Sequence, residues 1–358
     1  MKFIDRLNLW KKDSLGYRNK FMFDPYFIAE IGVNHENSIE KAKLMIEQAF
    51  TSGANAVKFQ SYKADRLAAK DSPSYWDTTE ESTNSQYELF KKYDSLVKKD
   101  YLDLKNYCDE LGVEFLTTPF DNFFVDELDE ILTFYKIASA DITNYPLLEK
   151  VASKGKPIIL STGASDKKEI ESTLKFLETF KVEIILNQCI LSYPTEIKEA
   201  NLGMISDLIN SYPNNIVGFS DHTPPTEDFY VQIFSVLLGA TFIEKHFTFD
   251  KSLPGNDHYH SFDASDLSNF YSKLNQFKEI YGQAEKEIIE IELPARQNAR
   301  RSLYFSSNLK KGSIIANSHL VPKRPGNGLS PINYKKLVGR TINQDVFEDQ
   351  LVEIEMFE

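Results

Sequence analysis

The feature that most constrains the fold is a series of eight short apolar runs, each ending in polar residues and most separated by helix-patterned stretches. The runs are almost continuously hydrophobic, which is typical of strands buried on both faces of a parallel sheet. Residues 38–53 have apolar residues three and four apart and end in glycine, as an amphipathic helix does. The eight runs are 27–32, 56–60, 114–120, 135–139, 157–163, 182–189, 216–222 and 242–247.

Eight strand-then-helix units over roughly 250 residues are what a closed (β/α)8 TIM barrel requires. We therefore predict an α/β barrel over residues 1–285, with residues 1–25 as an N-terminal extension, and an open doubly wound sheet is the alternative. After residue 285 the pattern changes to short strands with "KKG" and "RPGNG" turns. We expect a linker at 286–295 and a small, mostly β second domain at 296–358.

One connection breaks the rhythm of the barrel. Residues 61–100, after the second strand, form a long polar stretch that contains several aromatic side chains. Loops of that length in a compact domain are usually functional or disordered. On a barrel this loop is expected to lie over the mouth at the C-terminal ends of the strands.

Composition limits the classes of partner and the compartment. The 358 residues are 42% hydrophobic and 26% charged, as in an ordinary soluble protein. The net charge of −12 argues against a nucleic acid or an anionic membrane as the main partner. Two cysteines, Cys108 and Cys189, make no disulfide framework, and no stretch has the apolar length of a signal peptide or a membrane span. A cytoplasmic protein with a small-molecule substrate is expected.

Seven of the eight runs end in side chains able to do chemistry. In a parallel barrel these ends converge on one mouth, where active sites lie. We therefore expect one site containing Glu30, Lys58, Gln60, Thr118, Lys136, Ser139, Ser161, Ser220, His222, Glu244 and His246.

Two histidines end neighbouring strands of the inferred barrel. Ser220 and His222, like Glu244 and His246, are two residues apart and therefore share one face of their strand. Two imidazoles with a carboxylate nearby suit a divalent metal with open positions, and on chemistry alone manganese, magnesium, zinc and iron all fit. Glu244 is interpreted as the carboxylate neighbour of His246, either a water-mediated ligand or the group that orients it, whereas Lys245 faces the other way and is structural. The alternative is a pair of satisfied core histidines.

Two lysines lie inside otherwise apolar runs, "AVKFQ" and "FYKIAS". Lys58 and Lys136, with the hydroxyls of Ser139 and Ser161, suit a phosphate or a carboxylate. The alternative is that both lysines reach solvent. The sequence has no P-loop, GxGxxG, GxSxG or HExxH motif, so nucleotide, serine-hydrolase and zincin interpretations lack support.

At these residues the chain resembles the sialic acid synthase family, which includes N-acetylneuraminate, legionaminic acid and pseudaminic acid synthases. The matching stretches occur in family order through almost the whole chain. They are "AEIGVNH" (29–35), "AVKFQ" (56–60), "TTPFD" (117–121), "YKIASADITNYPLL" (135–148), "KPIILSTG" (156–163), "SYPT" (192–195), "VGFSDHT" (217–223), "IEKHFTFDKSLPGNDH" (243–258) and "VPKRPGNGLSP" (321–331).

The resemblance implies a TIM barrel followed by an antifreeze-like (SAF-type) domain, in a domain-swapped homodimer. It implies condensation of phosphoenolpyruvate with an N-acetylmannosamine-type sugar to a nine-carbon 2-keto acid and phosphate, with C–O cleavage. It also implies a divalent metal, typically Mn2+ with Mg2+ or Co2+ as alternatives, held by His222 and His246.

The resemblance also assigns roles to individual positions. Glu30, Lys136, His222 and His246 match catalytic positions, and Arg324 matches an arginine that the antifreeze-like domain lends across the dimer to the N-acyl group of the sugar. Positions that hold phosphoenolpyruvate are matched by Lys58, Thr118, Lys136, Ser139, Ser161 and Ser220; positions near the sugar are matched by Gln60, Tyr193, Asp257 and Arg324.

The chain departs from the family pattern at four positions. Gln188, Ile190 and Leu191 replace the usual histidine, threonine and asparagine, and Asp141 stands where many relatives have glutamate. All four are expected on the sugar side of the mouth, so both N-acetylmannosamine and 2,4-diacetamido-2,4,6-trideoxy-mannose stay open as substrates. Two other functions stay open as alternatives: a synthase of the 3-deoxy-octulosonate phosphate type, and a non-catalytic carbohydrate-binding protein.

Overall fold

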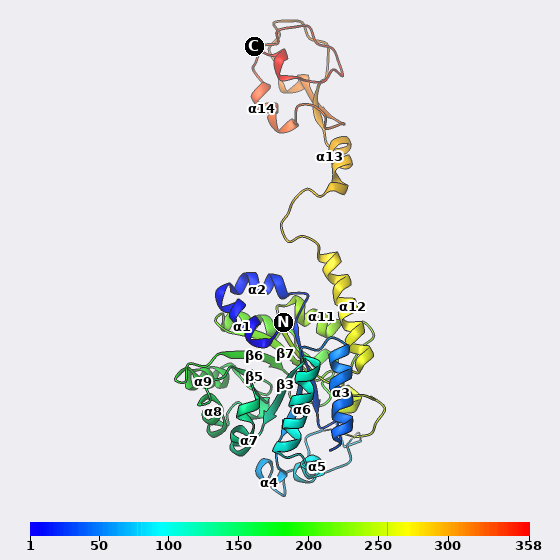
Figure 1. Cartoon of the computed structure of the whole chain (residues 1–358). Coiled ribbons are helices and arrows are strands. Elements are labelled where there is room, and N and C mark those ends of the chain that lie inside the picture. The colour runs from blue at the N-terminus through cyan, green and yellow to red at the C-terminus, as the bar shows by residue number, and fades with distance from the viewer. Residues whose placement is uncertain (77, 80, 256) are drawn as a thin grey trace. The chain divides into compact units, whose positions relative to one another are not determined.

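The computed structural model describes residues 1–358 except 77, 80 and 256. The chain divides into two compact units, Met1–Tyr281 and Gly282–Glu358, each with its own core. The first unit contains every apolar run that the sequence assigned to the barrel (Figure 1).

The first unit is an eight-stranded parallel barrel, as predicted. The strands pair in the order β3-β2-β1-β8-β7-β6-β5-β4, and β3 and β4 lie beside each other to close the ring. Nearly every strand residue is buried, because the barrel interior covers one face and the helices cover the other. The strands are β1 (Tyr26–Gly32), β2 (Ala56–Ser61), β3 (Glu114–Pro119), β4 (Tyr135–Ile137), β5 (Ile158–Ser161), β6 (Ile184–Cys189), β7 (Ile216–Asp221) and β8 (Phe242–His246).

A helix follows each strand and packs on the outside of the barrel (Figure 1). Several begin at residues that cap free backbone N–H groups: Ser38 accepts from Lys41 N, and Asp166 accepts from Lys168 N and Glu169 N. The eight helices are α3 (Ile39–Thr51), α6 (Lys98–Leu111), α7 (Asn122–Leu128), α8 (Tyr145–Ala152), α9 (Lys167–Glu178), α10 (Gly203–Ser211), α11 (Tyr230–Leu237) and α12 (Ala264–Tyr281).

Two N-terminal helices, α1 (Phe3–Lys12) and α2 (Ser14–Phe21), precede the barrel. Phe3 stacks on Phe134 with ring centroids 3.8 Å apart and meets Tyr26 and Phe242 edge-on. Tyr26 and Phe242 are the first residues of their strands, so Phe3 plugs the end of the barrel opposite the mouth. The N-terminal segment therefore belongs to the barrel core.

The connection between β2 and α6 carries two short helices, α4 (Ala64–Leu67) and α5 (Gln86–Tyr93). It contributes residues to the cavity at the C-terminal ends of the strands, as the sequence predicted for this loop. Short 3-10 helices occupy other connections: η1 (Asp129–Ile131), η2 (Ser139–Asp141), η3 (Ile197–Glu199) and η4 (His258–His260).

The second unit has less regular strand structure than its sequence predicted. Its one named sheet pairs β9 (Ser302–Phe305) with β10 (Leu320–Lys323), and isolated bridges tie other segments together. Leu303, Phe305 and Phe357 belong to its own buried cluster. Its helices are α13 (Leu293–Ala299), α14 (Tyr334–Leu337), η5 (Glu290–Glu292), η6 (Asn317–His319), η7 (Pro331–Asn333) and η8 (Ile354–Met356).

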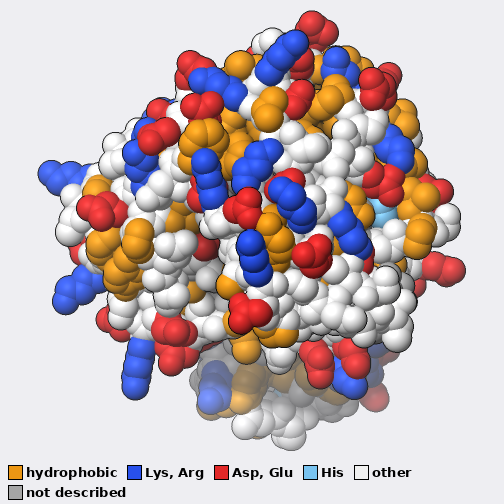
Figure 2. Space-filling view, turned by 90° about the horizontal axis from the view of Figure 1, so that it is seen from below, with side chains coloured by type: hydrophobic (Ala, Val, Ile, Leu, Met, Phe, Trp, Pro, Cys, Tyr) orange, Lys and Arg blue, Asp and Glu red, His pale blue; other side chains and the backbone are white. Residues whose placement is uncertain are grey.

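Charges on the outside of the molecule are mixed. On the face in Figure 2, Lys and Arg side chains are interspersed with Asp and Glu. None of the helices within the described residues is long and apolar enough to cross a membrane.

Candidate active site

A cavity of about 530 Å³ opens where the barrel strands end. Its walls bring together nearly all of the site residues that the sequence predicted. Arg324 belongs to the second unit, whose placement relative to the barrel is not defined. The predicted residues that line the cavity are Glu30, Lys58, Gln60, Thr118, Lys136, Ser139, Ser161, Tyr193, Ser220, His222, Glu244, His246 and Asp257.

One half of the cavity is built around two buried lysines and is called the lysine cluster here: Lys58, Lys136, Glu30 and Glu244 with the hydroxyls beside them. The Lys58 ammonium forms an ion pair with Glu30 and donates to Thr118 Oγ1 at 3.1 Å. The Lys136 ammonium donates to Ser161 Oγ at 2.7 Å. Neither lysine reaches solvent, so the alternative interpretation of these residues is wrong.

Glu244 lies between the two lysines. Its Oε1 is 3.6 Å from Lys136 Nζ and 3.9 Å from Lys58 Nζ, and it accepts a hydrogen bond from Ser220 Oγ at 3.1 Å. Its Oε2 has no hydrogen-bond partner among the described residues, so its role beside His246 stays a prediction. The carboxylate nearest the His246 ring nitrogen is Asp257, from the loop after β8.

Burial shifts the titration of the lysine cluster. Burial lowers the pKa of Lys136, and it raises the pKa of Glu30 to about 7 although Lys58 opposes the shift. Burial also favours the neutral form of Glu244, but the charges of Lys136 and Lys58 outweigh it and lower the pKa of Glu244. Glu30 can therefore exchange a proton near neutral pH, whereas Glu244 stays ionised.

Gly32 lets two side chains of the cluster approach the backbone at the end of β1. Its φ of +56° is in the left-handed region that favours glycine. A Cβ there would lie 3.1 Å from Glu30 Oε1 and 3.2 Å from Gln60 Nε2. Gln60 Nε2 donates to the same Glu30 oxygen at 3.2 Å, so the glycine leaves room for this contact.

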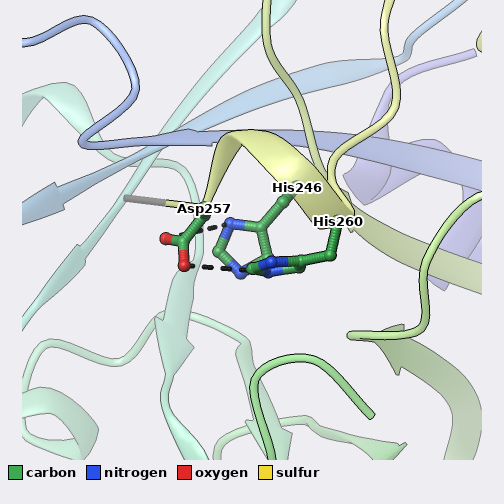
Figure 3. A group of neighbouring side chains, drawn as sticks. All are labelled: His246, Asp257 and His260. Atoms are coloured by element: carbon green, nitrogen blue, oxygen red, sulfur yellow. Dashed lines mark ion pairs between the residues drawn. The ribbon is translucent and has the colours of Figure 1, made fainter. Parts of the chain in front are cut away.

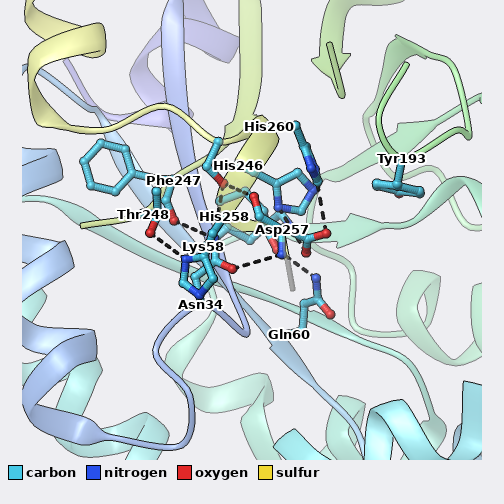
Figure 4. Close-up of polar contacts among 12 residues, drawn as sticks. Asn34, Lys58, Gln60, Tyr193, His246, Phe247, Thr248, Asp257, His258 and His260 are labelled. Atoms are coloured by element: carbon cyan, nitrogen blue, oxygen red, sulfur yellow. Dashed lines mark hydrogen bonds and ion pairs between the residues drawn. The ribbon is translucent and has the colours of Figure 1, made fainter. Parts of the chain in front are cut away.

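The other half of the cavity is the histidine cluster, defined as His222, His246, Asp257 and His260. The two predicted ligands, His222 and His246, have ring centroids 5.5 Å apart. Asp257 lies 3.5 Å from His246 Nδ1 and 3.7 Å from His260 Nε2 (Figure 3). Figure 4 shows this group beside Lys58 and Gln60, so the two clusters face one cavity.

The hydrogen bonds of His222 fix the state of its ring. Its Nδ1 is 2.8 Å from the carbonyl oxygen of Ile190, which can only accept, so Nδ1 carries the proton. Burial lowers the pKa of His222 to about 4, which keeps the ring neutral. Its Nε2 therefore has a free lone pair, and the ring lies beside Tyr193, with 4.1 Å between centroids and a tilt of 38°.

The histidine cluster fits a divalent metal ion. Burial lowers the pKa of His246 and of His260 well below the ordinary value, so both imidazoles are neutral ligands. Burial raises the pKa of Asp257 to about 7, which a cation beside it would reverse. His246 Nδ1 is buried without a hydrogen-bond partner among the described residues. Ligand atoms of His246, Asp257 and His260 all lie within 4.8 Å of one another.

His260 is a site residue that the sequence argument missed. It lies in η4, two residues past the end of the "GNDH" stretch, where strand periodicity gives no direction for a side chain. The sequence did contain one indication of a metal site here, because "DHYH" places an acid and two histidines within four residues.

The four departures from the family pattern do not all reach the cavity. Asp141 and Leu191 line it, as expected. Gln188 points out of the barrel, with its Nε2 3.5 Å from Met204 Sδ on α10, so its placement on the sugar side is wrong. Ile190 contributes its backbone carbonyl to His222. The alternation of side chains along β6 explains the direction of Gln188: Cys189 faces the cavity, so the residue before it must face outward.

Aromatic side chains from the connection between β2 and α6 cover the remaining wall. Tyr75, Trp76 and Phe90 line the cavity. The Tyr75 ring meets Tyr193 edge-on at 6.2 Å, which places it on the histidine side. This wall is therefore an apolar surface close to the His222 and Tyr193 rings.

The fold and these two clusters define a TIM-barrel cavity in which two buried lysines lie beside neutral imidazoles. The model of the NeuB family matches residues 45–286, and the model of the SAF domain matches residues 300–358. The chain belongs to the NeuB family.

Individual relatives match over nearly the whole chain. An uncharacterized protein of Methanocaldococcus jannaschii is 38% identical, covering 96% of this chain and 97% of its own. The N,N'-diacetyllegionaminic acid synthase of Legionella pneumophila is 35% identical, and the match covers 90% of this chain and 91% of that protein. The solved N-acetylneuraminic acid synthetase of Leptospira borgpetersenii, in complex with citrate, is 32% identical with a TM-score of 0.65, covering 76% of this chain and 90% of that chain.

Proposed function

We propose that this NeuB-family synthase condenses phosphoenolpyruvate with an unphosphorylated N-acylated amino sugar of the mannose type. The products are a nine-carbon 2-keto acid and inorganic phosphate. The single observation that carries the proposal is the division of one cavity into a buried lysine cluster and a neutral histidine cluster.

The lysine cluster is proposed to bind phosphoenolpyruvate. Lys58 and Lys136 supply charge, and hydroxyls aligned by them supply further hydrogen bonds to phosphate and carboxylate oxygens. Ser139 is fixed by a hydrogen bond from Gly163 N to its Oγ at 2.9 Å, so its hydroxyl hydrogen is free to donate. The remaining hydroxyls in this role are those of Thr118, Ser161 and Ser220.

The histidine cluster is proposed to receive the sugar aldehyde. A divalent metal held there by His222 and His246, with Mn2+ the favoured ion, supplies Lewis-acid polarisation of the aldehyde oxygen. Gln60, Tyr193 and Asp257 surround the position where the sugar would lie. Their contacts orient the aldehyde carbon toward the enol carbon of phosphoenolpyruvate.

The proposed reaction forms one carbon–carbon bond and breaks the C–O bond between phosphoenolpyruvate and its phosphate. The enol carbon C3 forms a bond to the aldehyde carbon, and the aldehyde oxygen gains a proton. Water adds to C2 and gives up one proton, which offsets the proton gained by the aldehyde oxygen. The C2 hydroxyl of the tetrahedral intermediate then loses its proton to the leaving phosphate as the C–O bond breaks and the C2 carbonyl forms. Glu30, whose pKa is about 7, is placed to accept the proton from water and to return one to the new hydroxyl.

An unphosphorylated sugar is favoured by the charges of the cavity wall. Among the described lining residues the cationic side chains are Lys58 and Lys136, both assigned to phosphoenolpyruvate. A sugar phosphate would need a second cationic group, which disfavours the 3-deoxy-octulosonate phosphate type of synthase.

The apolar wall favours a sugar with several methyl groups. Tyr75 lies on the histidine side and Trp76 packs against it, so a deoxy carbon and acetamido methyls would bury apolar surface there. We therefore place 2,4-diacetamido-2,4,6-trideoxy-mannose first and N-acetylmannosamine second. The relative in Legionella pneumophila, which is named for legionaminic acid, supports this order.

A homodimer would complete the site through the second unit. We propose that Arg324 of one subunit contacts the N-acyl group of the sugar in the barrel of its partner. A guanidinium carries five N–H donors and a permanent charge, so it can donate a hydrogen bond to the carbonyl oxygen of an amide at the edge of a cavity.

The test is phosphate release from phosphoenolpyruvate with purified protein, Mn2+ and each candidate sugar. We expect release only when a sugar is present, with the diacetamido sugar giving the higher kcat/KM. Absence of sugar-dependent release with both sugars would overturn the proposal. Release only with a sugar phosphate would instead support the octulosonate-type alternative.

A further inference from the structure

His260 is a buried histidine that hydrogen bonding does not explain. The residue is fully buried, and neither ring nitrogen has a hydrogen-bond partner among the residues that the structure describes. A buried imidazole without partners loses its hydrogen bonds to water and gains none in return. An interaction partner outside the chain would account for its position.

A second histidine of the same short helix behaves differently. His258 is equally buried, but its Nδ1 shares a hydrogen bond with Thr248 Oγ1 at 2.7 Å. This bond anchors η4 to the strand extension after β8 (Figure 4). His258 is therefore structural, whereas His260 is held in place by its neighbours with both nitrogens unused.

The nitrogens of His260 face a carboxylate and a second imidazole. Asp257 Oδ1 lies 3.7 Å from His260 Nε2, and the other carboxylate oxygen lies 3.5 Å from His246 Nδ1. The two imidazole rings are 5.0 Å apart between centroids. Figure 3 shows the carboxylate directed at both rings, and the separations exceed hydrogen-bond distance. The arrangement leaves space for an ion between the three groups.

We propose that His260 is a third imidazole of the metal site, so that His246, Asp257 and His260 hold the ion together with the predicted ligand His222. This inference extends the proposed function, because the family resemblance gave only His222 and His246 as ligands. A site with three imidazoles and one carboxylate favours Mn2+, Fe2+, Co2+ or Zn2+ over Mg2+, which prefers an all-oxygen shell.

The test is metal binding to the full chain, measured by titration calorimetry with Mn2+, Co2+ and Mg2+ separately. His260→Phe keeps an aromatic ring but removes both nitrogens, and His260→Ala removes the ring. Loss of groups that only orient metal ligands weakens binding about 10- to 100-fold, so we expect at least that loss for Mn2+ and Co2+ in both variants. The visible absorption spectrum of the Co2+-loaded protein should also change, because the coordination changes.

Two controls separate this inference from folding and from catalysis. His319→Ala removes a half-buried imidazole of the second unit and should leave metal affinity unchanged. Circular dichroism melting curves show whether each His260 variant folds. Unchanged Mn2+ affinity and an unchanged Co2+ spectrum in a folded His260→Phe variant would overturn the inference while leaving the proposed synthase intact. If the His260 variants bind metal more weakly but the wild type shows no sugar-dependent phosphate release, the inference stands and the proposed synthase function is overturned.

Discussion

The two halves of the cavity differ in how far the chain itself completes them. In the lysine cluster, both ammonium groups already have hydroxyl and carboxylate partners, and Glu244 balances charge between them. In the histidine cluster, His246 Nδ1 and both nitrogens of His260 lack hydrogen-bond partners among the described residues. The comparison teaches that the polar groups of the first half are already paired within the chain, whereas those of the second half are not, which is what the proposed anion and metal sites require.

The largest expected effect comes from removing a ligand of the histidine cluster. His246→Ala should abolish metal-dependent condensation, a loss of about 10³-fold or more, because several kcal/mol of Lewis-acid stabilisation disappear. The melting temperature should stay close to that of the wild type, since Nδ1 of the ring has no hydrogen-bond partner among the described residues and its contact with Asp257 is a long one of 3.5 Å. An assay of phosphate release measures the loss of activity, and circular dichroism measures the melting temperature. Full activity in His246→Ala would show that this half plays no part in catalysis.

Glu30→Gln tests the proton transfer that we propose for Glu30. Loss of a general acid or base costs roughly 10²–10⁴ in rate. In the wild type, Glu30 is protonated below a pKa of about 7 and cannot accept a proton, so kcat/KM should rise with pH through about 7. This limb of the pH profile should vanish in Glu30→Gln. A limb that persists in the variant would assign the titration to another group.

Lys136→Met tests the lysine cluster. Removing one preorganised cationic donor should lower kcat/KM for phosphoenolpyruvate by roughly 10²–10³, and it leaves Glu244 with one fewer counter-charge. Metal affinity should not change, because the residue lies in the other half. Lys156→Met, just before the start of β5 at the end opposite the mouth and paired with Asp129, is the matched control and should retain activity. An equal loss in both variants would point to stability instead of binding.

The smallest effect is expected for Arg324, which belongs to the second unit. Arg324→Ala should raise KM for the sugar about tenfold, equivalent to about 1.4 kcal/mol, and leave KM for phosphoenolpyruvate unchanged. Steady-state kinetics with each substrate varied in turn measures the two constants. A change confined to phosphoenolpyruvate would contradict the assignment of this arginine to the sugar.

The barrel could be predicted because buried parallel strands leave a strong signal. Each strand reads as a continuous apolar run, so an interrupting Lys58 or Lys136 was visible as a residue with a function. Their position inside apolar runs correctly indicated that both lysines are buried, and the period of two correctly turned Lys245 away from His246, where it pairs with Asp221 at 2.9 Å. The same rule would have placed Gln188 outside, because Cys189 faces inward.

The end of the barrel opposite the mouth and the loop after β8 could not be predicted in this way, because no sequence period fixes their side-chain contacts. Phe3 closes the barrel through contacts with Phe134 and Phe242, which are more than a hundred residues away in sequence. Asp257 and His260 lie in a loop, where the direction of a side chain depends on the tertiary structure and on no local period. Glu244 shares a strand face with His246, but its carboxylate turns to the lysines because their charges attract it.

The most direct test of the account uses phosphoenolpyruvate whose bridging oxygen, between C2 and phosphorus, is a heavy isotope. The account predicts that the heavy oxygen leaves with phosphate, and only when Mn2+ and the diacetamido sugar or N-acetylmannosamine are both present. Mass spectrometry of the released phosphate and of the keto acid measures where the label goes. Heavy oxygen in the keto acid, or phosphate release that does not depend on sugar, would contradict the account.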